Sequence, residues 1–244
     1  MAEDNQKPIA LVTGANRGLG FEVCRQLANQ GMTVMLTARD RQKGEQATQK
    51  LLQEGLQVIF KPLDVADDQS VSHLAQQLQA ELGHIDILIN NAGTNFDFQQ
   101  QTLAADLNDV QRTLNTNLFG AWRMTQAFLP LLKNSQHGRI VNVSSGAGSF
   151  TGPRGLLEQS GGLPAYSVSK TALNALTVKL SRSLQETGIL VNAVCPNFTA
   201  TYPGTEEMGA RPVPEGAAGI VWAAMLPDDG PTGGFFRDSQ PLPW

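Results

Sequence analysis

The chain has 244 residues, of which 41% are hydrophobic and 16% are charged, with a formal net charge of −4. This length suits one α/β domain with a full core, and the scattered basic residues exclude the positive field typical of nucleic-acid-binding proteins. No apolar run approaches the roughly 18 residues of a membrane span, and the first eight residues do not resemble a signal peptide. With only two cysteines, far apart, the sequence predicts a cytoplasmic protein without disulfides.

Short apolar strands alternate with amphipathic helices along the whole chain. In the first half of the chain, strands are predicted at 9–14, 33–38, 57–65 and 85–93. Helices are predicted between them at 18–31, 41–55 and 67–83. In the second half, a loop and a helix are predicted over 103–115, and further helices at 118–133, 165–187 and 215–226. Strands are predicted at 138–145, 189–195 and 234–236. Uninterrupted apolar strands separated by helices indicate a parallel sheet covered on both faces. Right-handed crossovers then predict an α/β, Rossmann-type, doubly wound fold, with one domain over residues 1–244.

The first predicted strand ends in the sequence TGANRGLG, which contains Gly14, Gly18 and Gly20. The spacing differs from the G-x-G-x-x-G pattern and lacks the Lys-Ser/Thr ending of an ATP phosphate loop. Gly14 permits a sharp turn, and the other two leave room for a pyrophosphate at the positive end of the following helix. An ordinary strand-to-helix turn is the alternative.

Two arginines bear on the choice of dinucleotide. Arg17 lies inside the glycine turn, and Arg39 follows the second strand. An acidic residue in the place of Arg39 would bind the ribose 2′-hydroxyl of NAD, whereas arginine can pair with the 2′-phosphate of NADP. Asp40 is the competing acidic candidate. The two arginines favour NADP(H) over NAD(H), with solvated surface arginines as the alternative.

Four stretches stand in a single order: TGANRGLG, NNAG (90–93), VNVSS (141–145) and YSVSK (166–170). Together they resemble the short-chain dehydrogenase/reductase family over nearly the whole chain. The long gap before Tyr166 and the ending PDDGPTGGFFRD (227–238) are most similar to NADPH-dependent carbonyl reductases.

The resemblance implies a catalytic set and a cofactor-binding set. The catalytic residues would be Asn117, Ser145, Tyr166 and Lys170, with Ser144 as the rival for the serine role. The residues that would bind the cofactor are Gly14, Asn16, Arg17, Gly18, Leu19, Gly20, Arg39, Asp64, Val65, Asn91, Ala92, Gly93, Tyr166, Lys170, Pro196, Thr199 and Thr201. Among these, Asp64 and Val65 would meet the adenine, and Thr199 and Thr201 the nicotinamide carboxamide.

The spacing of Tyr166 and Lys170 suggests how such a site would work. Residues four apart on a helix share one face, roughly 5–6 Å apart at Cβ, so the ammonium is expected to lower the tyrosine pKa. Lowering the tyrosine pKa from about 10 to about 7 requires roughly 4 kcal/mol of stabilisation of the phenolate. Ser145 and an oxidised nicotinamide would supply part of this energy. NADPH would give hydride to a carbonyl carbon, Ser145 would bind the oxygen and Tyr166 would protonate it. The resemblance adds that Lys170 holds the nicotinamide ribose and Asn117 anchors a water.

Aromatic residues cluster on loops that follow strand ends, where such sheets bind ligands. In one interpretation these residues form a pocket for an apolar ketone or aldehyde, which would contact Ser145, Phe96, Phe150, Phe198 and Tyr202. Ordinary packing of these side chains beneath the loops is an equal alternative. The two loops concerned are 146–164, an insertion before the tyrosine, and 196–214, the substrate loop. The insertion either shapes the mouth of the pocket or lies at a subunit contact, so the sequence leaves open whether the protein forms a homo-oligomer. Asn197 stands where the family usually has glycine; it tolerates left-handed backbone but would crowd the nicotinamide end or the pocket.

Three further points complete the predictions. His73, His84 and His137 have no ligand-like spacing, so no metal is expected. A second enzymatic reading is an NAD-linked alcohol or hydroxysteroid dehydrogenase. A reading of another class is a non-catalytic NADP(H)-binding redox sensor, which would not need all four catalytic residues in order.

Overall fold

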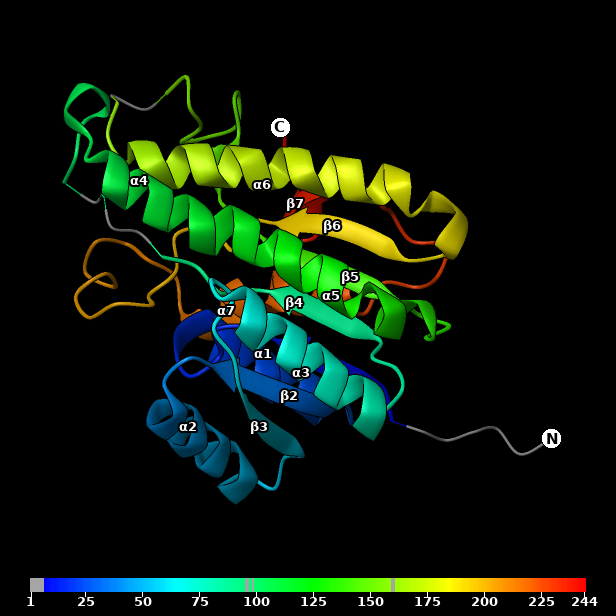
Figure 1. The fold of residues 1–244 in the computed structure, drawn as a ribbon. Helices are drawn as coiled ribbons and strands as arrows, with labels where there is room; N and C mark the ends of the chain where they lie inside the picture. Colours follow the sequence, from blue (N-terminus) through cyan, green and yellow to red (C-terminus); the bar gives the residue numbers. More distant parts are fainter. Residues whose placement is uncertain (1–6, 95–96, 98, 159–160) are drawn as a thin grey trace.

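The computed structural model describes residues 7–94, 97, 99–158 and 161–244. Among these residues, eight strands form one sheet in the order β3-β2-β1-β4-β5-β6-β7-β8 (Figure 1). All neighbouring pairs are parallel except β7 with β8. The order reverses between β1 and β4, as in a doubly wound Rossmann-type sheet. The predicted fold class is confirmed.

The elements follow the predicted alternation. The strands are β1 (Ile9–Val12), β2 (Thr33–Ala38), β3 (Val58–Pro62), β4 (Ile87–Asn90), β5 (Arg139–Val143), β6 (Leu190–Val194), β7 (Phe235–Arg237) and β8 (Gln240–Pro241). The longer helices are α1 (Gly18–Asn29), α2 (Arg41–Gln53), α3 (Asp68–Glu81), α4 (Leu107–Leu114), α5 (Ala121–Lys133), α6 (Pro164–Ser183) and α7 (Val213–Ala224). Most strands are shorter than predicted because the residues after each strand turn into the loops at the sheet edge. The two-residue strand β8 was not predicted.

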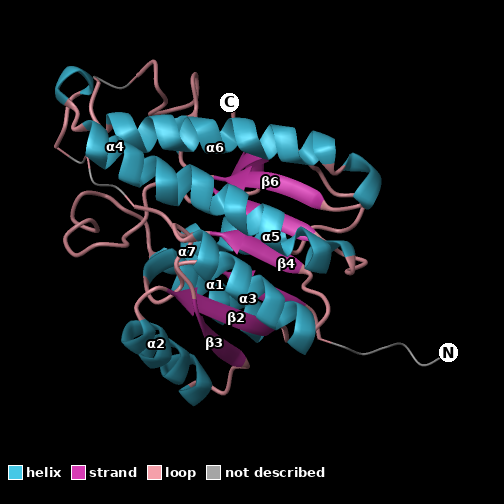
Figure 2. Ribbon diagram, in the orientation of Figure 1, coloured by secondary structure: helices cyan, strands magenta, loops and turns pink. Residues whose placement is uncertain are grey.

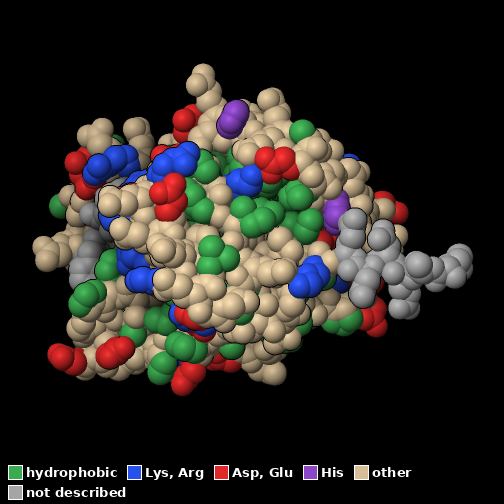
Figure 3. All heavy atoms as spheres, turned by 90° about the horizontal axis from the view of Figure 1, so that it is seen from below, with side chains coloured by type: hydrophobic (Ala, Val, Ile, Leu, Met, Phe, Trp, Pro, Cys, Tyr) green, Lys and Arg blue, Asp and Glu red, His purple; other side chains and the backbone are tan. Residues whose placement is uncertain are grey.

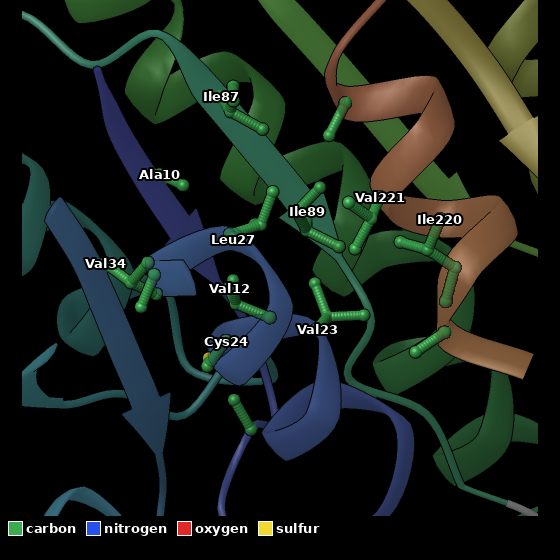
Figure 4. Close-up of a cluster of buried hydrophobic side chains, with 14 of the residues drawn as sticks. Ala10, Val12, Val23, Cys24, Leu27, Val34, Ile87, Ile89, Ile220 and Val221 are labelled. Atoms are coloured by element: carbon green, nitrogen blue, oxygen red, sulfur yellow. The ribbon is translucent and has the colours of Figure 1, made fainter. Parts of the chain in front are cut away.

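Helices cover both faces of the sheet (Figure 2). Val12 on β1 packs in one cluster with α1, α2 and α7, and part of this cluster is drawn in Figure 4. Its neighbour Leu11 points to the opposite face and packs with α3 and α5, because successive strand side chains alternate. Burial on both faces explains why β1, β4, β5 and β6 are buried along their whole length. The central strands are therefore rigid supports for the loops at their ends.

The predicted interruption between two helices is wrong. Helices were expected within 103–115 and at 118–133, but α4 and α5 are joined by a π-helical segment, Asn115–Gly120. Such wide turns are rare and occur frequently at functional sites. The segment contains Asn117, one of the predicted catalytic residues.

Asp67 caps α3 by accepting a hydrogen bond from the Gln69 amide at 2.9 Å. Basic and acidic side chains are interspersed on the face in Figure 3. Within the part of the chain that the structure describes, no helix combines the length and the apolarity that crossing a bilayer requires. Cys24 and Cys195 are both buried free thiols.

Candidate active site

The carboxyl ends of the parallel strands bring the separated motifs to one edge of the sheet. The glycine turn follows β1, the NNAG loop follows β4, and Ser144 and Ser145 follow β5. The loop after β6 (orange in Figure 1) and the beginning of α6 lie at the same side. Parallel strands end at a common edge, so the predicted residues meet there although they are far apart in sequence.

The glycine turn is closely packed against the NNAG loop. Gly14 has φ +62°, and a Cβ atom there would lie 2.8 Å from the Ala92 Cα. The Asn91 side chain donates hydrogen bonds to the carbonyls of Thr13 (2.8 Å) and Gly14 (3.1 Å). A Cβ at Gly20 would lie 2.8 Å from the Ala15 Cα. Both positions therefore need glycine for space, and Gly14 also for its backbone conformation.

The beginning of α1 is suited to an anion. Arg17 occupies the N-cap position, and its side chain does not cap the first turn, so the amides there can bind a ligand. Beside this turn lies a cavity of about 380 Å³. Its lining is Asn16, Arg17, Gly18, Phe21, Lys43, Gln46, Ala47 and Lys50. Every charged side chain in that lining is a cation, which favours a phosphate. The cavity lies beside the glycine turn, and Tyr166 does not line it.

Arg39 and Asp40 take different positions after β2. Arg39 is exposed. Asp40 caps α2 by accepting a hydrogen bond from the Lys43 amide at 3.1 Å, and this bond is the main cause of the lowered pKa of its carboxyl. Asp40 is thus engaged as a helix cap, whereas Arg39 is exposed at the same strand end.

Arg17 also connects the glycine turn to the loop after β6, a contact that the sequence did not predict. Its Nη1 donates to the Thr201 carbonyl at 3.0 Å, and its guanidinium lies 4.7 Å from the centre of the Tyr202 ring. Tyr202, predicted to contact substrate, is 57% exposed and stacks on this arginine. Nothing in the local sequence signals a contact across 184 residues.

The remaining predicted cofactor residues lie at neighbouring strand ends. Asp64 follows β3, and its Oδ1 accepts from the Ala66 amide at 2.9 Å. Val65 is buried and lies against Gly120. Thr199 is buried, and its hydroxyl donates to the Pro196 carbonyl at 2.8 Å.

Thr13 is a residue of the candidate site that the sequence reasoning missed. Its hydroxyl oxygen accepts hydrogen bonds from the amides of Asn91 (3.0 Å) and Ala92 (2.9 Å), and it donates to the Ile89 carbonyl at 3.2 Å. It holds the NNAG loop beside the glycine turn. The one available signal was its place immediately before Gly14.

The four predicted catalytic residues are gathered around the beginning of α6. Lys170 is buried; its Nζ donates to the Val143 carbonyl at 2.8 Å and lies 5.6 Å from the centre of the Tyr166 ring. The Ser145 side chain lies near the Tyr166 phenol and opposes the rise of its pKa. A Cβ at Gly93 would lie within van der Waals distance of both Asn117 Oδ1 (3.6 Å) and Lys170 Nζ (3.7 Å).

Asn117 is held rigidly by the loop after β4 and by α6. Its amide nitrogen donates to the Thr94 carbonyl (2.9 Å) and to the Ser169 hydroxyl (3.0 Å). Its Oδ1 accepts from the Thr94 amide at 2.8 Å. The side chain therefore joins the π-helical segment, the NNAG loop and the catalytic helix.

The expected lowering of the Tyr166 pKa by Lys170 is wrong for the protein's own groups. Burial raises the pKa of Tyr166 to about 12, opposed by the Ser145 side chain. Burial also lowers the pKa of Lys170 to about 8. Desolvation disfavours the charged form of each group, and it is the largest cause of both pKa shifts. The phenol is consequently protonated at neutral pH.

The structure distinguishes the two adjacent serines. Ser144 is buried, and its hydroxyl donates to the Asn174 side-chain oxygen at 2.6 Å. Ser145 is partly exposed, and it is the serine whose side chain acts on the pKa of the Tyr166 phenol. Neighbouring residues of an extended chain point to opposite sides, so only one of the pair can face Tyr166.

The residues predicted to contact substrate are less closely grouped than the predicted catalytic residues. Phe150 is 53% exposed, and Phe198 is partly buried with the Arg154 guanidinium 5.8 Å from its ring centre. Phe96 lies outside the described residues. Asn197 has φ +61°, which confirms the expected left-handed turn, and its side chain is exposed. Over the described ranges, no group of three or more His, Cys, Asp and Glu residues is arranged to hold a metal ion.

Comparisons with known proteins agree with this geometry. The family model for short chain dehydrogenases matches residues 8–209. (+)-Neomenthol dehydrogenase of Arabidopsis thaliana is 34% identical over 98% of this chain and 99% of its own length. Carbonyl reductase [NADPH] 1 of Mus musculus is also 34% identical, over 98% of this chain and 99% of its own.

A solved structure extends the likeness to three dimensions. The NADPH-bound carbonyl reductase from chicken fatty liver superimposes with a TM-score of 0.86 at 29% identity, covering 98% of this chain and 100% of that one. The family match, the curated relatives and the shared fold lead to one conclusion: the chain belongs to the short-chain dehydrogenase family.

Proposed function

We propose that the chain is an oxidoreductase that uses NADPH to reduce the carbonyl group of ketones or aldehydes. The observation that carries this proposal is that Tyr166, Ser145 and Lys170 come together at the beginning of α6, with Lys170 Nζ 5.6 Å from the centre of the Tyr166 ring. The likeness to carbonyl reductase [NADPH] 1 and to an NADPH-bound carbonyl reductase supports it.

The residues at the sheet edge fit NADP(H). Gly14 and Gly20 leave no room for a side chain, and the uncapped first turn of α1 offers amides to the pyrophosphate. Arg17 and Arg39 are the candidate partners of the 2′-phosphate, with Asp40 engaged as a helix cap. The predicted site over 14–20, 64–65, 91–93 and 196–201 would hold the rest of the cofactor. Bound NADPH would supply the hydride.

The chain's own residues would bind the carbonyl oxygen and protonate it. Ser145 would donate a hydrogen bond to the oxygen as negative charge develops there. Tyr166 would transfer its phenolic proton to that oxygen, which yields the alcohol. The resulting phenolate would be stabilised by the Lys170 ammonium nearby and reprotonated from solvent. A phenol whose pKa is raised by burial is held in the form that this step requires.

The proposal is tested by offering the purified protein a panel of small ketones and aldehydes with NADPH or NADH. Loss of nicotinamide absorbance with NADPH is expected for at least one apolar carbonyl compound, together with formation of the matching alcohol. Turnover only in the oxidising direction with NAD would favour an alcohol dehydrogenase instead. Tight NADPH binding without turnover of any compound would contradict the proposal and favour a cofactor-binding sensor.

Replacing Arg39 with Asp is expected to shift the cofactor preference from NADPH toward NADH. A carboxylate would repel the 2′-phosphate and could accept a hydrogen bond from a 2′-hydroxyl. The measurement is the ratio of kcat/KM for the two cofactors with one carbonyl substrate. Arg182→Asp, which makes the same charge change in the last turn of α6, is the control. An unchanged ratio in Arg39→Asp would remove Arg39 from the site.

The reduction rate is expected to fall as the pH rises through about 8, the pKa of Lys170. Below that pH the ammonium stabilises the forming phenolate, whereas above it the neutral amine cannot. The measurement is kcat/KM for reduction against pH at saturating NADPH. Lys170→Arg, whose guanidinium stays charged, should lose this decline if it retains turnover. A profile that stays level well above pH 8 in the unmodified chain would contradict the assignment.

A further inference from the structure

Asp97 is a fully buried carboxylate close to the catalytic helix. It lies in the loop after β4, and its side chain has no solvent exposure. Its Oδ2 accepts hydrogen bonds from the backbone amides of Ala165 (2.6 Å) and Tyr166 (3.3 Å). Its Oδ1 has no hydrogen-bond partner within the described part of the chain. A side chain 69 residues away thus caps the first turn of α6.

The beginning of α6 needs an external cap. Leu163 precedes the helix with φ +56° and ψ +44°, a left-handed conformation that non-glycine residues seldom adopt. Its apolar side chain cannot accept a hydrogen bond from the first turn. Pro164 has no amide hydrogen, so Ala165 and Tyr166 carry the first free amides of the helix. Those two amides are the ones that Asp97 binds, in the role that a local Ser or Asp usually fills.

Other contacts hold the Asp97 loop against the same end of α6. Gln101 pairs with Gly162 in an antiparallel bridge. The Thr102 amide and hydroxyl both donate to the Gly161 carbonyl, at 3.0 and 2.8 Å. Residues 101 and 102 are thus held against the segment that precedes α6, and Asp97 binds the Tyr166 amide directly.

The unpaired Oδ1 argues against a purely stabilising role. A buried polar atom without a partner destabilises a fold, and each such atom in a native structure calls for an explanation. We propose that Asp97 is a positioning residue for Tyr166: it fixes the first turn of α6 so that the phenol meets Ser145. The proposal rests on the role of Tyr166 in the proposed function.

The test compares Asp97→Ala with Asp97→Asn. Asp97→Ala is expected to lower kcat on the order of 100-fold, because a displaced acid loses its alignment with the carbonyl oxygen, while the NADPH dissociation constant is unchanged. Asp97→Asn keeps an oxygen that can accept from both amides, so it is expected to recover most of kcat. An Asn variant as slow as the Ala variant would overturn the capping role.

A matched control separates positioning from stability. Asp67→Ala removes a cap of the same kind from α3, a helix without predicted site residues. It should lower the melting temperature and leave kcat unchanged. If Asp97→Ala also lowers only the melting temperature, the proposal is overturned. If Asp97→Ala does not fold, Asp97→Ser replaces it in the test. Its hydroxyl is a shorter acceptor, so its kcat is expected to be lower than that of Asp97→Asn but still measurable. Full activity in Asp97→Ser would overturn the proposal.

Amide hydrogen exchange tests the same contact without turnover. Asp97→Asn should protect the amides of Ala165 and Tyr166 nearly as well as the unmodified chain, and Asp97→Ala should expose them. Unchanged exchange in Asp97→Ala would overturn the proposal. A failure of the proposed function would be visible separately, as the absence of carbonyl reduction by the unmodified chain.

Discussion

Tyr166→Phe is expected to lower kcat for carbonyl reduction by about 10²–10⁴-fold while leaving NADPH binding nearly intact. The substitution removes one hydroxyl group and keeps the ring that lies near Lys170. No other phenol is placed to donate a proton beside Ser145 in the described residues, so the carbonyl oxygen would have to take its proton from water.

The measurement is kcat with a carbonyl substrate, together with the NADPH dissociation constant from fluorescence. The chain has two tyrosines, so Tyr202→Phe removes the other phenolic hydroxyl and keeps the ring that stacks on Arg17. That control should lose far less of kcat than Tyr166→Phe, because the Tyr202 hydroxyl is not the proton donor. Normal turnover by Tyr166→Phe would show that the phenol is not the acid.

The adjacent serines provide the second large effect. Ser145→Ala is expected to lower kcat by about 10²–10³-fold, as loss of one donor to a developing oxyanion does. Its stability should change little, because Ser145 is partly exposed. The measurement is kcat at saturating NADPH for the variant and the unmodified chain.

Ser144→Ala is the matched control and should behave in the opposite way. It leaves the buried Asn174 oxygen without its donor, which is expected to lower the free energy of unfolding by about 1–3 kcal/mol. Its kcat should remain close to that of the unmodified chain. Urea denaturation gives the free energy of unfolding. Loss of kcat in Ser144→Ala with normal kcat in Ser145→Ala would reverse the assignment of the two serines.

The sequence predicted the fold where local patterns decide it. Apolar strands alternating with amphipathic helices are a local signal, and they sufficed for the doubly wound sheet. The sequence indicated Asp67 or Asp68 as the cap of the helix that follows, and the structure shows Asp67, whose partner Gln69 is two residues away. Gly14 was recognisable because it ends a strand and begins a turn. The motif order also predicted the family, since four short patterns in register are far more specific than one.

The candidate site depends on contacts that no local pattern contains. The link from Arg17 to Thr201 and the cap from Asp97 to Tyr166 span 184 and 69 residues. The π-helical segment around Asn117 was also missed, because the same residues are compatible with an ordinary helix.

The sequence by itself determined which chemical groups the site contains: a phenol one helical turn from an amine, a serine pair and a glycine turn. Only the tertiary structure decided their protonation. The spacing of Tyr166 and Lys170 predicted a lowered tyrosine pKa, whereas burial raises it to about 12. The physical reason is that attraction between two groups follows from their spacing, but desolvation depends on everything that packs around them.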